Sequence, residues 1–107
     1  MTNLHHLDIL INNAGIGRMS KLRDRKLLQD FDALFRLNVR APLYLTQLAH
    51  QALIESKGCV VNVASIGSLV AAPMMLPYAM GKAAVTSMTK SLAVDLGRKG
   101  VRVNEVK

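Results

Sequence analysis

Three short runs of branched apolar residues, separated by longer stretches with helical spacing, restrict the folds open to this sequence. The runs are LDILI at 7–11, CVVNVA at 59–64 and VRVNEV at 101–106. Each is bounded by glycine or by polar turn residues, which is typical of strands. Strands that alternate with helices pair in parallel through right-handed crossovers. The pattern therefore predicts an α/β fold with a three-stranded parallel sheet, in which the first two strands are buried on both faces.

The interval between the first two runs has the spacing of two consecutive helices. Apolar side chains recur every three or four residues over 27–35, after a candidate cap at Asp24, and again over 45–53. Pro42 lies between the two sets, and proline disrupts helical hydrogen bonding because it has no N–H. We therefore expect a kink or a break at 38–42.

A further helix is predicted to begin at Pro77, because proline suits the first helical turn. Its apolar face extends to Leu96, and Gly97 and Gly100 are expected to end it. No linker, internal repeat or low-complexity tract divides the sequence. We therefore interpret residues 1–107 as a single unit.

The charge of the sequence suggests anionic partners, but its distribution does not suit nucleic acid. Fourteen Lys and Arg residues against seven Asp and Glu give a net charge of +7, which attracts anions over long range. The basic residues are scattered, and only two Phe and two Tyr accompany them, so a basic surface interleaved with aromatic rings is missing. We expect no nucleic-acid partner.

Cysteine, histidine and the N-terminal residues argue against further classes. The single cysteine, Cys59, rules out an intrachain disulfide, and no Cys or His spacing matches a metal site. The first residues lack the charged region of a signal peptide, and no apolar run approaches membrane-spanning length. We expect a cytoplasmic protein with no bound metal and no membrane partner.

A tyrosine and a lysine stand four positions apart in PYAMGKAAV, at the start of the last predicted helix. On a helix, Tyr78 and Lys82 share one face. An ammonium group beside a phenol favours the phenolate, which suits general acid or base catalysis. The same spacing also occurs in ordinary surface pairs, so the pair alone does not identify a site.

Other polar residues accompany this pair at places that parallel sheets use for ligands. Ser65 ends the second strand, NNAG at 12–15 closes the first, and Asn38 lies at the expected helix break. The carboxyl ends of parallel strands line the ligand crevice. With LDILINNAGI, VVNVASIGS, YAMGKAAVTSMTKSLAVDLG and GVRVNEVK in this order, nearly the whole chain resembles the short-chain dehydrogenase/reductase family.

The resemblance implies a hydride transfer between NAD or NADP and an alcohol or carbonyl. Tyr78 would be the general acid or base, and Lys82 would hold the ribose hydroxyls of the cofactor and support the tyrosine. Ser65 would hydrogen-bond the substrate oxygen, and Asn38 would hold a water of the proton relay with its backbone. Purely structural roles are the alternatives: Ser65 would form a turn, and Asn38 would cap a broken helix.

The resemblance also implies further contacts to cofactor and substrate. Asn13, Ala14 and Gly15 would lie against the cofactor, and the NNAG segment would brace the sheet. The apolar stretch LVAAPMMLP at 69–77 would border the pocket and favour a hydrophobic alcohol or carbonyl substrate. Gly15 as a simple turn, and local packing of 69–77, are the competing readings.

The glycine-rich phosphate-binding turn of the family does not occur before Leu7. The resemblance therefore implies a partial doubly wound, Rossmann-like sheet, corresponding to the central and C-terminal part of the family fold. This argues against cofactor binding and activity by this chain alone. We also expect an open edge at the first strand and a bare sheet face, which predict marginal stability or a need for a partner.

Three hypotheses follow for the function. The chain represents an NAD(P)-dependent oxidoreductase, or it is a truncated, inactive fragment, or it is an incomplete sequence with no role of its own. A truncated fragment would act by associating with full-length subunits through its two long helices, which in the family pack across a subunit interface. The family resemblance implies a homo-oligomer in either functional case.

Overall fold

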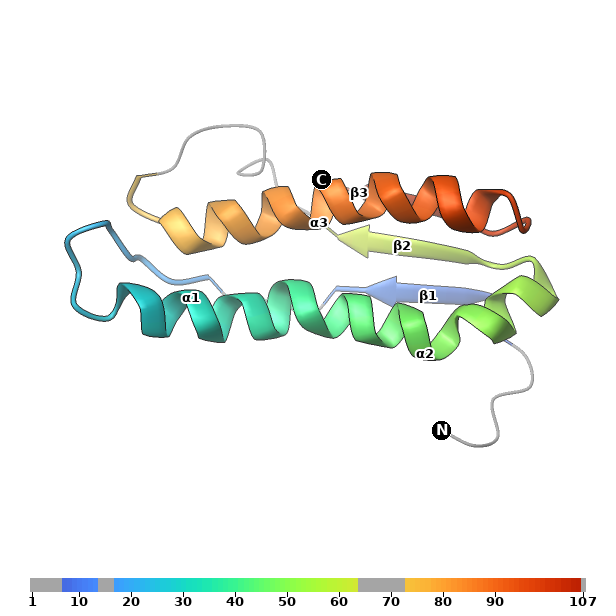
Figure 1. Cartoon of the computed structure of the whole chain (residues 1–107), viewed down its shortest axis with the longest axis horizontal. Coiled ribbons are helices and arrows are strands. Elements are labelled where there is room, and N and C mark those ends of the chain that lie inside the picture. The colour runs from blue at the N-terminus through green and yellow to red at the C-terminus, as the bar shows by residue number, and fades with distance from the viewer. Residues whose placement is uncertain (1–6, 14–16, 64–72, 107) are drawn as a thin grey trace.

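The computed structural model describes residues 7–13, 17–63 and 73–106, and Figure 1 shows their arrangement. The described residues form three strands, three α-helices and one π-helical turn. The elements are β1 (Ile9–Asn12), α1 (Leu27–Phe35), η1 (Arg36–Arg40), α2 (Ala41–Ser56), β2 (Cys59–Val63), α3 (Leu76–Gly97) and β3 (Arg102–Val106). None of these helices is long and apolar enough to cross a membrane.

The three strands form one parallel sheet in the order β1-β2-β3. The register places Asn12 of β1 opposite Asn62 of β2, and Asn62 opposite Glu105 of β3. In Figure 1, α2 and α3 run beside one another and opposite to the strands, as right-handed crossovers require. The predicted α/β class is confirmed, although β1 begins and ends slightly later than the run 7–11.

The core lies between the sheet and the two long helices. Leu53 of α2, Val60 of β2 and Val101 before β3 are fully buried, and Leu96 of α3 joins the same cluster. Burial of such side chains contributes about 1.5–3 kcal/mol each. These contacts hold α2 and α3 on one face of the sheet.

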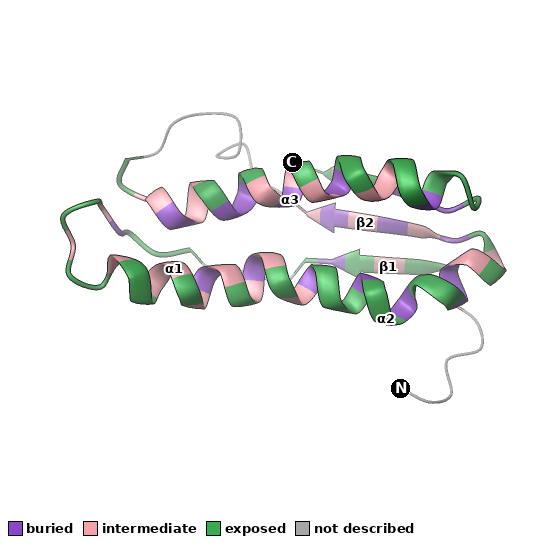
Figure 2. Cartoon of the chain, viewed as in Figure 1, coloured by how far each residue is buried: buried purple, intermediate pink, exposed green. Residues whose placement is uncertain are grey.

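The opposite face of β1 is exposed, so the expectation that β1 is buried on both faces is wrong for this chain. Ile9 and Ile11 are 55% and 61% exposed, whereas Asn12 is buried and Leu10 packs on the core cluster. Side chains alternate between the faces of a strand, and the described helices cover only one face. Figure 2 shows the resulting exposure along β1.

The first helix begins later than the candidate cap predicts. Asp24 instead closes a turn, because its carboxylate accepts the backbone N–H of Lys21 at 2.8 Å. Helix α1 starts at Leu27, after Lys26, whose side chain makes no capping bond. The carboxylate that was expected to cap the helix is used in the turn before it.

A π-helical turn replaces the kink or break expected at 38–42. The backbone N–H of Ala41 bonds to the carbonyl of Arg36, five residues earlier, and Pro42 lies in the first turn of α2. Pro42 has no N–H to give to the carbonyl four residues before it. Widening one turn accommodates the proline while α1, η1 and α2 continue along one direction (Figure 1).

The turn from α2 into β2 requires glycine. Lys57 adopts a left-handed conformation with φ of 53°, and Gly58 then passes so close to Asp8 that a Cβ would lie 2.3 Å from the Asp8 carbonyl oxygen. Cys59 donates its N–H to that same carbonyl at 2.8 Å, which starts the pairing of β2 with the chain before β1. The close approach therefore fixes the position of the central strand.

Candidate functional site

The predicted helix from Pro77 exists as α3 (Leu76–Gly97), and its first two turns carry Tyr78 and Lys82. The Lys82 Nζ lies 5.6 Å from the centroid of the Tyr78 ring. Lys82 is only 8% exposed and Tyr78 is half-buried, so this is no ordinary exposed pair. Within the described residues no carboxylate forms an ion pair with Lys82. An ammonium held this way stabilises negative charge on nearby oxygens.

Asn38 lies in the π-helical turn η1 and is 2% exposed. The turn packs against α3 at Gly81, where a Cβ would stand 3.7 Å from Val39 and 3.8 Å from Phe35. These contacts come from the neighbours of Asn38 and Lys82 in the chain. Packing therefore brings the Asn38 turn and the Lys82 turn together.

The segment after β1 crosses the start of α3. A Cβ on Gly17 would lie 3.4 Å from both Cδ1 and Cε1 of the Tyr78 ring, and 3.4 Å from Cε of Met75. Ser20 donates its N–H to the Met74 carbonyl at 2.8 Å, and its own carbonyl accepts the N–H of Leu76 at 3.1 Å. This bridge ties the residues that follow NNAG to the residues that precede Tyr78.

The remaining predicted residues are placed less fully. Asn13 is exposed directly after β1, at the carboxyl edge of the sheet. Ala14, Gly15 and Ser65 lie outside the described residues. Among the residues that the structure describes, no three His, Cys, Asp or Glu side chains are grouped to hold a metal ion.

A buried chain of polar side chains was not predicted in full. Asn12 Nδ2 donates to Asn62 Oδ1 at 2.8 Å and to Thr46 Oγ1 at 3.4 Å, and Asn62 Nδ2 donates to Thr89 Oγ1 at 2.9 Å. The signal available in the sequence is Asn62, a polar residue in phase with Val60 on the covered face of an apolar strand. Glycine contacts such as Gly17 against Tyr78 have no comparable signal.

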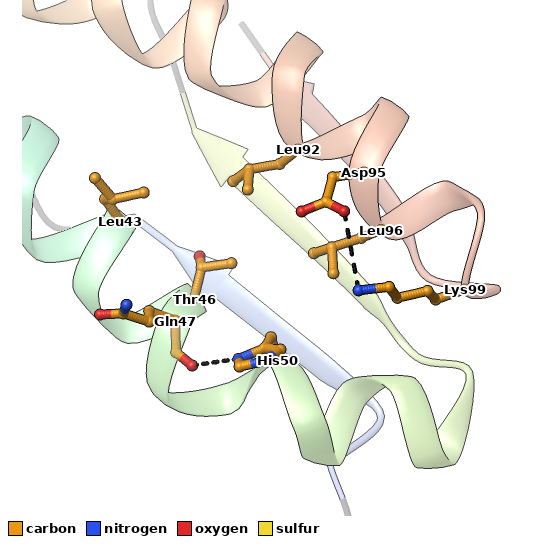
Figure 3. A pocket seen from close by; sticks show the side chains of 8 residues that line it. All are labelled: Leu43, Thr46, Gln47, His50, Leu92, Asp95, Leu96 and Lys99. Atoms are coloured by element: carbon orange, nitrogen blue, oxygen red, sulfur yellow. Dashed lines mark hydrogen bonds and ion pairs between the residues drawn. The ribbon is translucent and has the colours of Figure 1, made fainter.

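Two hollows accompany these residues. The first is an apolar hollow of about 200 Å³ between α1 and the start of α3, next to Tyr78 in the chain. It is lined by Leu27, Leu28, Phe31, Leu76, Pro77 and Met80. The second is a groove of about 370 Å³ between α2 and α3, shown in Figure 3. Leu43 and Thr46 of α2 face Leu92 and Leu96 of α3 across it, with His50 and Lys99 toward one end.

The parallel sheet with its crossing helices places the protein in the α/β class with a Rossmann-like sheet, and a tyrosine, a buried lysine and a buried asparagine lie at the start of α3 and in η1. The family model described as short chain dehydrogenase matches residues 1–107, the whole chain. The chain therefore belongs to the short-chain dehydrogenase family.

Curated relatives act as dehydrogenases by their names. The chain is 36% identical over 104 residues to L-fucose dehydrogenase of Mus musculus, covering 97% of this chain and 38% of that protein. It is 41% identical over 101 residues to cyclopentanol dehydrogenase of Comamonas testosteroni, covering 94% of this chain and 40% of the relative. The chain thus spans about two fifths of the length of these relatives.

Solved structures agree with this assignment. A gluconate 5-dehydrogenase from Burkholderia cenocepacia in complex with NADP and tartrate superposes with a TM-score of 0.87 at 35% identity, covering 94% of this chain and 39% of that one. A 4-hydroxyisoleucine dehydrogenase complexed with NADH gives a TM-score of 0.81 at 33% identity, covering 92% and 44%. The Rossmann-like fold and a family with nicotinamide cofactors are thereby shown.

Proposed function

We propose that the chain carries the catalytic part of an oxidoreductase that interconverts an alcohol and a carbonyl with NAD or NADP. The observation that carries the proposal is the burial of Lys82 with its Nζ 5.6 Å from the Tyr78 ring. Burying an ammonium costs free energy unless a partner compensates it. A cost of this kind at the carboxyl edge of a parallel sheet is typical of a functional site.

Each proposed residue has a role in proton transfer or orientation. Tyr78 takes the proton of the substrate hydroxyl during oxidation and returns it during reduction. Lys82 stabilises the phenolate form of Tyr78, which accepts the proton during oxidation and is left after the proton is given up during reduction. Ser65 orients the substrate oxygen, and Asn38 supports a water of the proton relay. The matching hydride is accepted or supplied by the nicotinamide.

The residues present fit the ribose of a nicotinamide cofactor. Lys82 offers N–H donors at a buried position with no carboxylate partner in the described part of the chain, and ribose hydroxyls are acceptors. Asn13, Ala14 and Gly15 follow β1 and complete the proposed contacts. The comparisons include complexes with NADP and with NADH, so both cofactors are candidates.

A hydrophobic substrate is proposed from the surroundings of Tyr78. Met75 shares the contact at Gly17 with the tyrosine ring, and the apolar hollow begins at Leu76 and Pro77. An apolar wall beside the proton-transfer group favours alcohols with hydrocarbon substituents. Cyclic and aliphatic secondary alcohols are therefore the first substrates to test.

The proposal is tested by binding and turnover. NADH and NADPH are titrated against the purified chain and against any longer form of the protein, with fluorescence as the readout and light scattering to report assembly. An alcohol and ketone screen follows on each form that binds. Tyr78→Phe should abolish turnover and leave cofactor binding largely intact, whereas Tyr44→Phe, at the exposed tyrosine of α2, should change neither. Turnover retained by Tyr78→Phe would refute the proposal.

A second candidate function is association with other subunits of the family. The observation in its favour is exposed apolar area on the long helices, where Leu43, Leu45 and Leu48 of α2 are 48%, 44% and 44% exposed. Leu43 lines the groove in Figure 3, whereas Leu45 and Leu48 are exposed outside it, and exposed apolar side chains are typical of interaction surfaces. Light scattering of Leu45→Gln/Leu48→Gln against the unchanged chain tests it; equal association of both would refute it.

A further inference from the structure

The buried polar chain joins the two helices that carry the candidate site. It runs from Thr46 on α2 through Asn12 on β1 and Asn62 on β2 to Thr89 on α3. All four side chains are at most 7% exposed. Most polar groups that are buried in a protein core are hydrogen-bonded, and these four side chains satisfy one another through their amide NH₂ groups and hydroxyls.

The two helices determine which group donates and which accepts in each hydrogen bond of this buried polar network. The Thr46 hydroxyl donates its proton to the Pro42 carbonyl, and the Thr89 hydroxyl donates its proton to the Val85 carbonyl, each at 2.8 Å. Both hydroxyl oxygens are therefore acceptors toward the sheet. Asn62 therefore turns its NH₂ group toward Thr89 and its oxygen toward β1, and the NH₂ group of Asn12 donates both to Thr46 and to that Asn62 oxygen. The Asn12 oxygen is buried without a hydrogen-bond partner among the described residues.

The two threonines lie in line with the candidate catalytic residues. Tyr78, Lys82, Val85 and Thr89 follow one another at spacings of four, three and four, which is one helix face. Lys82, Val85 and Thr89 are all buried. The bond between Thr89 and Asn62 thus fixes how α3 is rotated about its axis relative to the sheet, and with it the face that carries Tyr78 and Lys82.

The other end of the chain acts on the helix of Asn38 in the same way. Asn38, Pro42 and Thr46 lie at spacings of four and are all buried. The Pro42 carbonyl that receives the Thr46 proton belongs to the turn directly after η1. Thr46 therefore fixes the helix just behind the π-helical turn that holds Asn38.

We propose that Thr46, Asn12, Asn62 and Thr89 are positioning residues that set the distance between the Asn38 turn and the Tyr78–Lys82 pair. Helices α2 and α3 are both attached to β1 and β2 by these hydrogen bonds, and in each bond the donor and the acceptor cannot be exchanged. Loss of either threonine hydroxyl frees one helix to rotate or slide against the other. The inference rests on the proposed function for its catalytic consequence, but its structural coupling can be measured without activity.

The test that needs no activity uses amide resonances of the purified chain. Thr89→Val removes the hydroxyl and keeps the shape, so the ¹⁵N–¹H resonance of Asn38 on the other helix should move. Thr89→Ser keeps the acceptor and should restore it. Thr86→Val is the matched control, because that hydroxyl on α3 bonds to Glu105 of β3 and to the Lys82 carbonyl, whereas the Asn62 amide bonds to Thr89. Unchanged Asn38 resonances in Thr89→Val would overturn the inference.

The reciprocal variant guards against a loss of folding. Thr46→Val removes the 3.4 Å bond from Asn12 together with the local 2.8 Å bond to the Pro42 carbonyl, and it should move the Lys82 resonance on α3. If Thr89→Val does not fold, this variant carries the test alone, and an unmoved Lys82 resonance would overturn the inference.

Turnover, in a form of the protein that has it, gives an independent readout. Each Thr→Val variant should lower kcat/KM by about tenfold, as small misplacements of catalytic groups do. The double variant should lose little more than the worse single variant, because either change interrupts the same chain. Multiplied losses would overturn the coupling. If Tyr78→Phe retains turnover while the resonances move as expected, the proposed function fails and the coupling stands.

Discussion

The Lys82 ammonium lies 5.6 Å from the centroid of the Tyr78 ring, one helical turn away on α3, and only 8% of Lys82 is exposed. The attraction between a cation and an aromatic face is worth about 2 kcal/mol or more when the pair is desolvated. It does not offset the full cost of removing an ammonium from water. A lysine in this environment is better explained by a function than by stability.

Replacing Lys82 by Met should therefore stabilise the fold while removing function. The thioether side chain has similar length and no charge to desolvate, so the free energy of unfolding should rise by about 1 kcal/mol or more. Cofactor binding and turnover should both fall, because ribose contact and phenolate support disappear together. Urea unfolding and NADH titration measure the two effects, and Lys90→Met, at an exposed lysine of α3, is the control. A less stable Lys82→Met variant would contradict the argument.

Gly58 should not tolerate a side chain. A Cβ there would lie 2.3 Å from the Asp8 carbonyl oxygen and 2.9 Å from the Asp8 carbonyl carbon, and the obstacle is backbone that also pairs with Cys59. Gly58→Ala should lower the free energy of unfolding by about 3 kcal/mol, as overpacked sites do.

Gly97 provides the matched control for this change. It ends α3, and a Cβ there would meet nothing within 4 Å. Gly97→Ala should stabilise the protein by about 0.5–1 kcal/mol, since alanine loses less backbone entropy in a helix. Equal urea midpoints for the two variants would show that the Gly58 contact does not determine the turn.

Much of the architecture follows from local pattern, and the rest depends on contacts that sequence spacing does not encode. The runs at 59–64 and 101–106 form β2 and β3 because short runs of branched apolar residues between turns are typical of strands. The local pattern of β1 did not indicate an exposed face, because Ile9 and Ile11 look the same whether or not a helix covers them. Pro42 predicted a disturbance of the helix but not a π-helical turn. A kink, a break and a wider turn are all compatible with a residue that has no N–H to donate.

The candidate site was predictable to a similar degree. Helical spacing placed Tyr78 and Lys82 on one face, and the position of Asn38 near the proline placed it at a helix break, but their roles in a site came from the family resemblance and stay predictions. The Gly17 contact with the Tyr78 ring depends on the path of the connection after β1, which no periodicity describes. Thr46 and Thr89 were missed because a threonine on a helix is as often exposed as buried until the neighbouring strand is known.

Gly17 should limit the size of the residue that can stand over Tyr78. A Cβ at this position would be 3.4 Å from two carbons of the ring, an ordinary contact, so Gly17→Ala should retain most turnover. Gly17→Val adds two methyl groups that push the ring or the connection aside, and kcat/KM should fall by about tenfold. Circular dichroism checks that both variants fold. Equal activity of the two variants would show that the connection moves without affecting the tyrosine.

The exposed face of β1 should control self-association of the 107-residue chain. Ile9 and Ile11 are 55% and 61% exposed, and an apolar edge strand promotes pairing with other chains. The double change Ile9→Thr/Ile11→Thr keeps strand propensity and removes apolar area. Its mass by light scattering should fall toward that of a monomer, with the urea midpoint nearly unchanged.

Leu10 offers the opposite control within the same strand. Its side chain packs on the core cluster between the sheet and the helices, so Leu10→Thr should lower the free energy of unfolding by about 1–3 kcal/mol without reducing association. Comparing Leu10→Thr with Ile9→Thr/Ile11→Thr separates the effect of the core side of β1 on stability from the effect of its exposed side on association. Association that persists in Ile9→Thr/Ile11→Thr would assign it to another surface, for which the exposed leucines of α2 are the next to be changed.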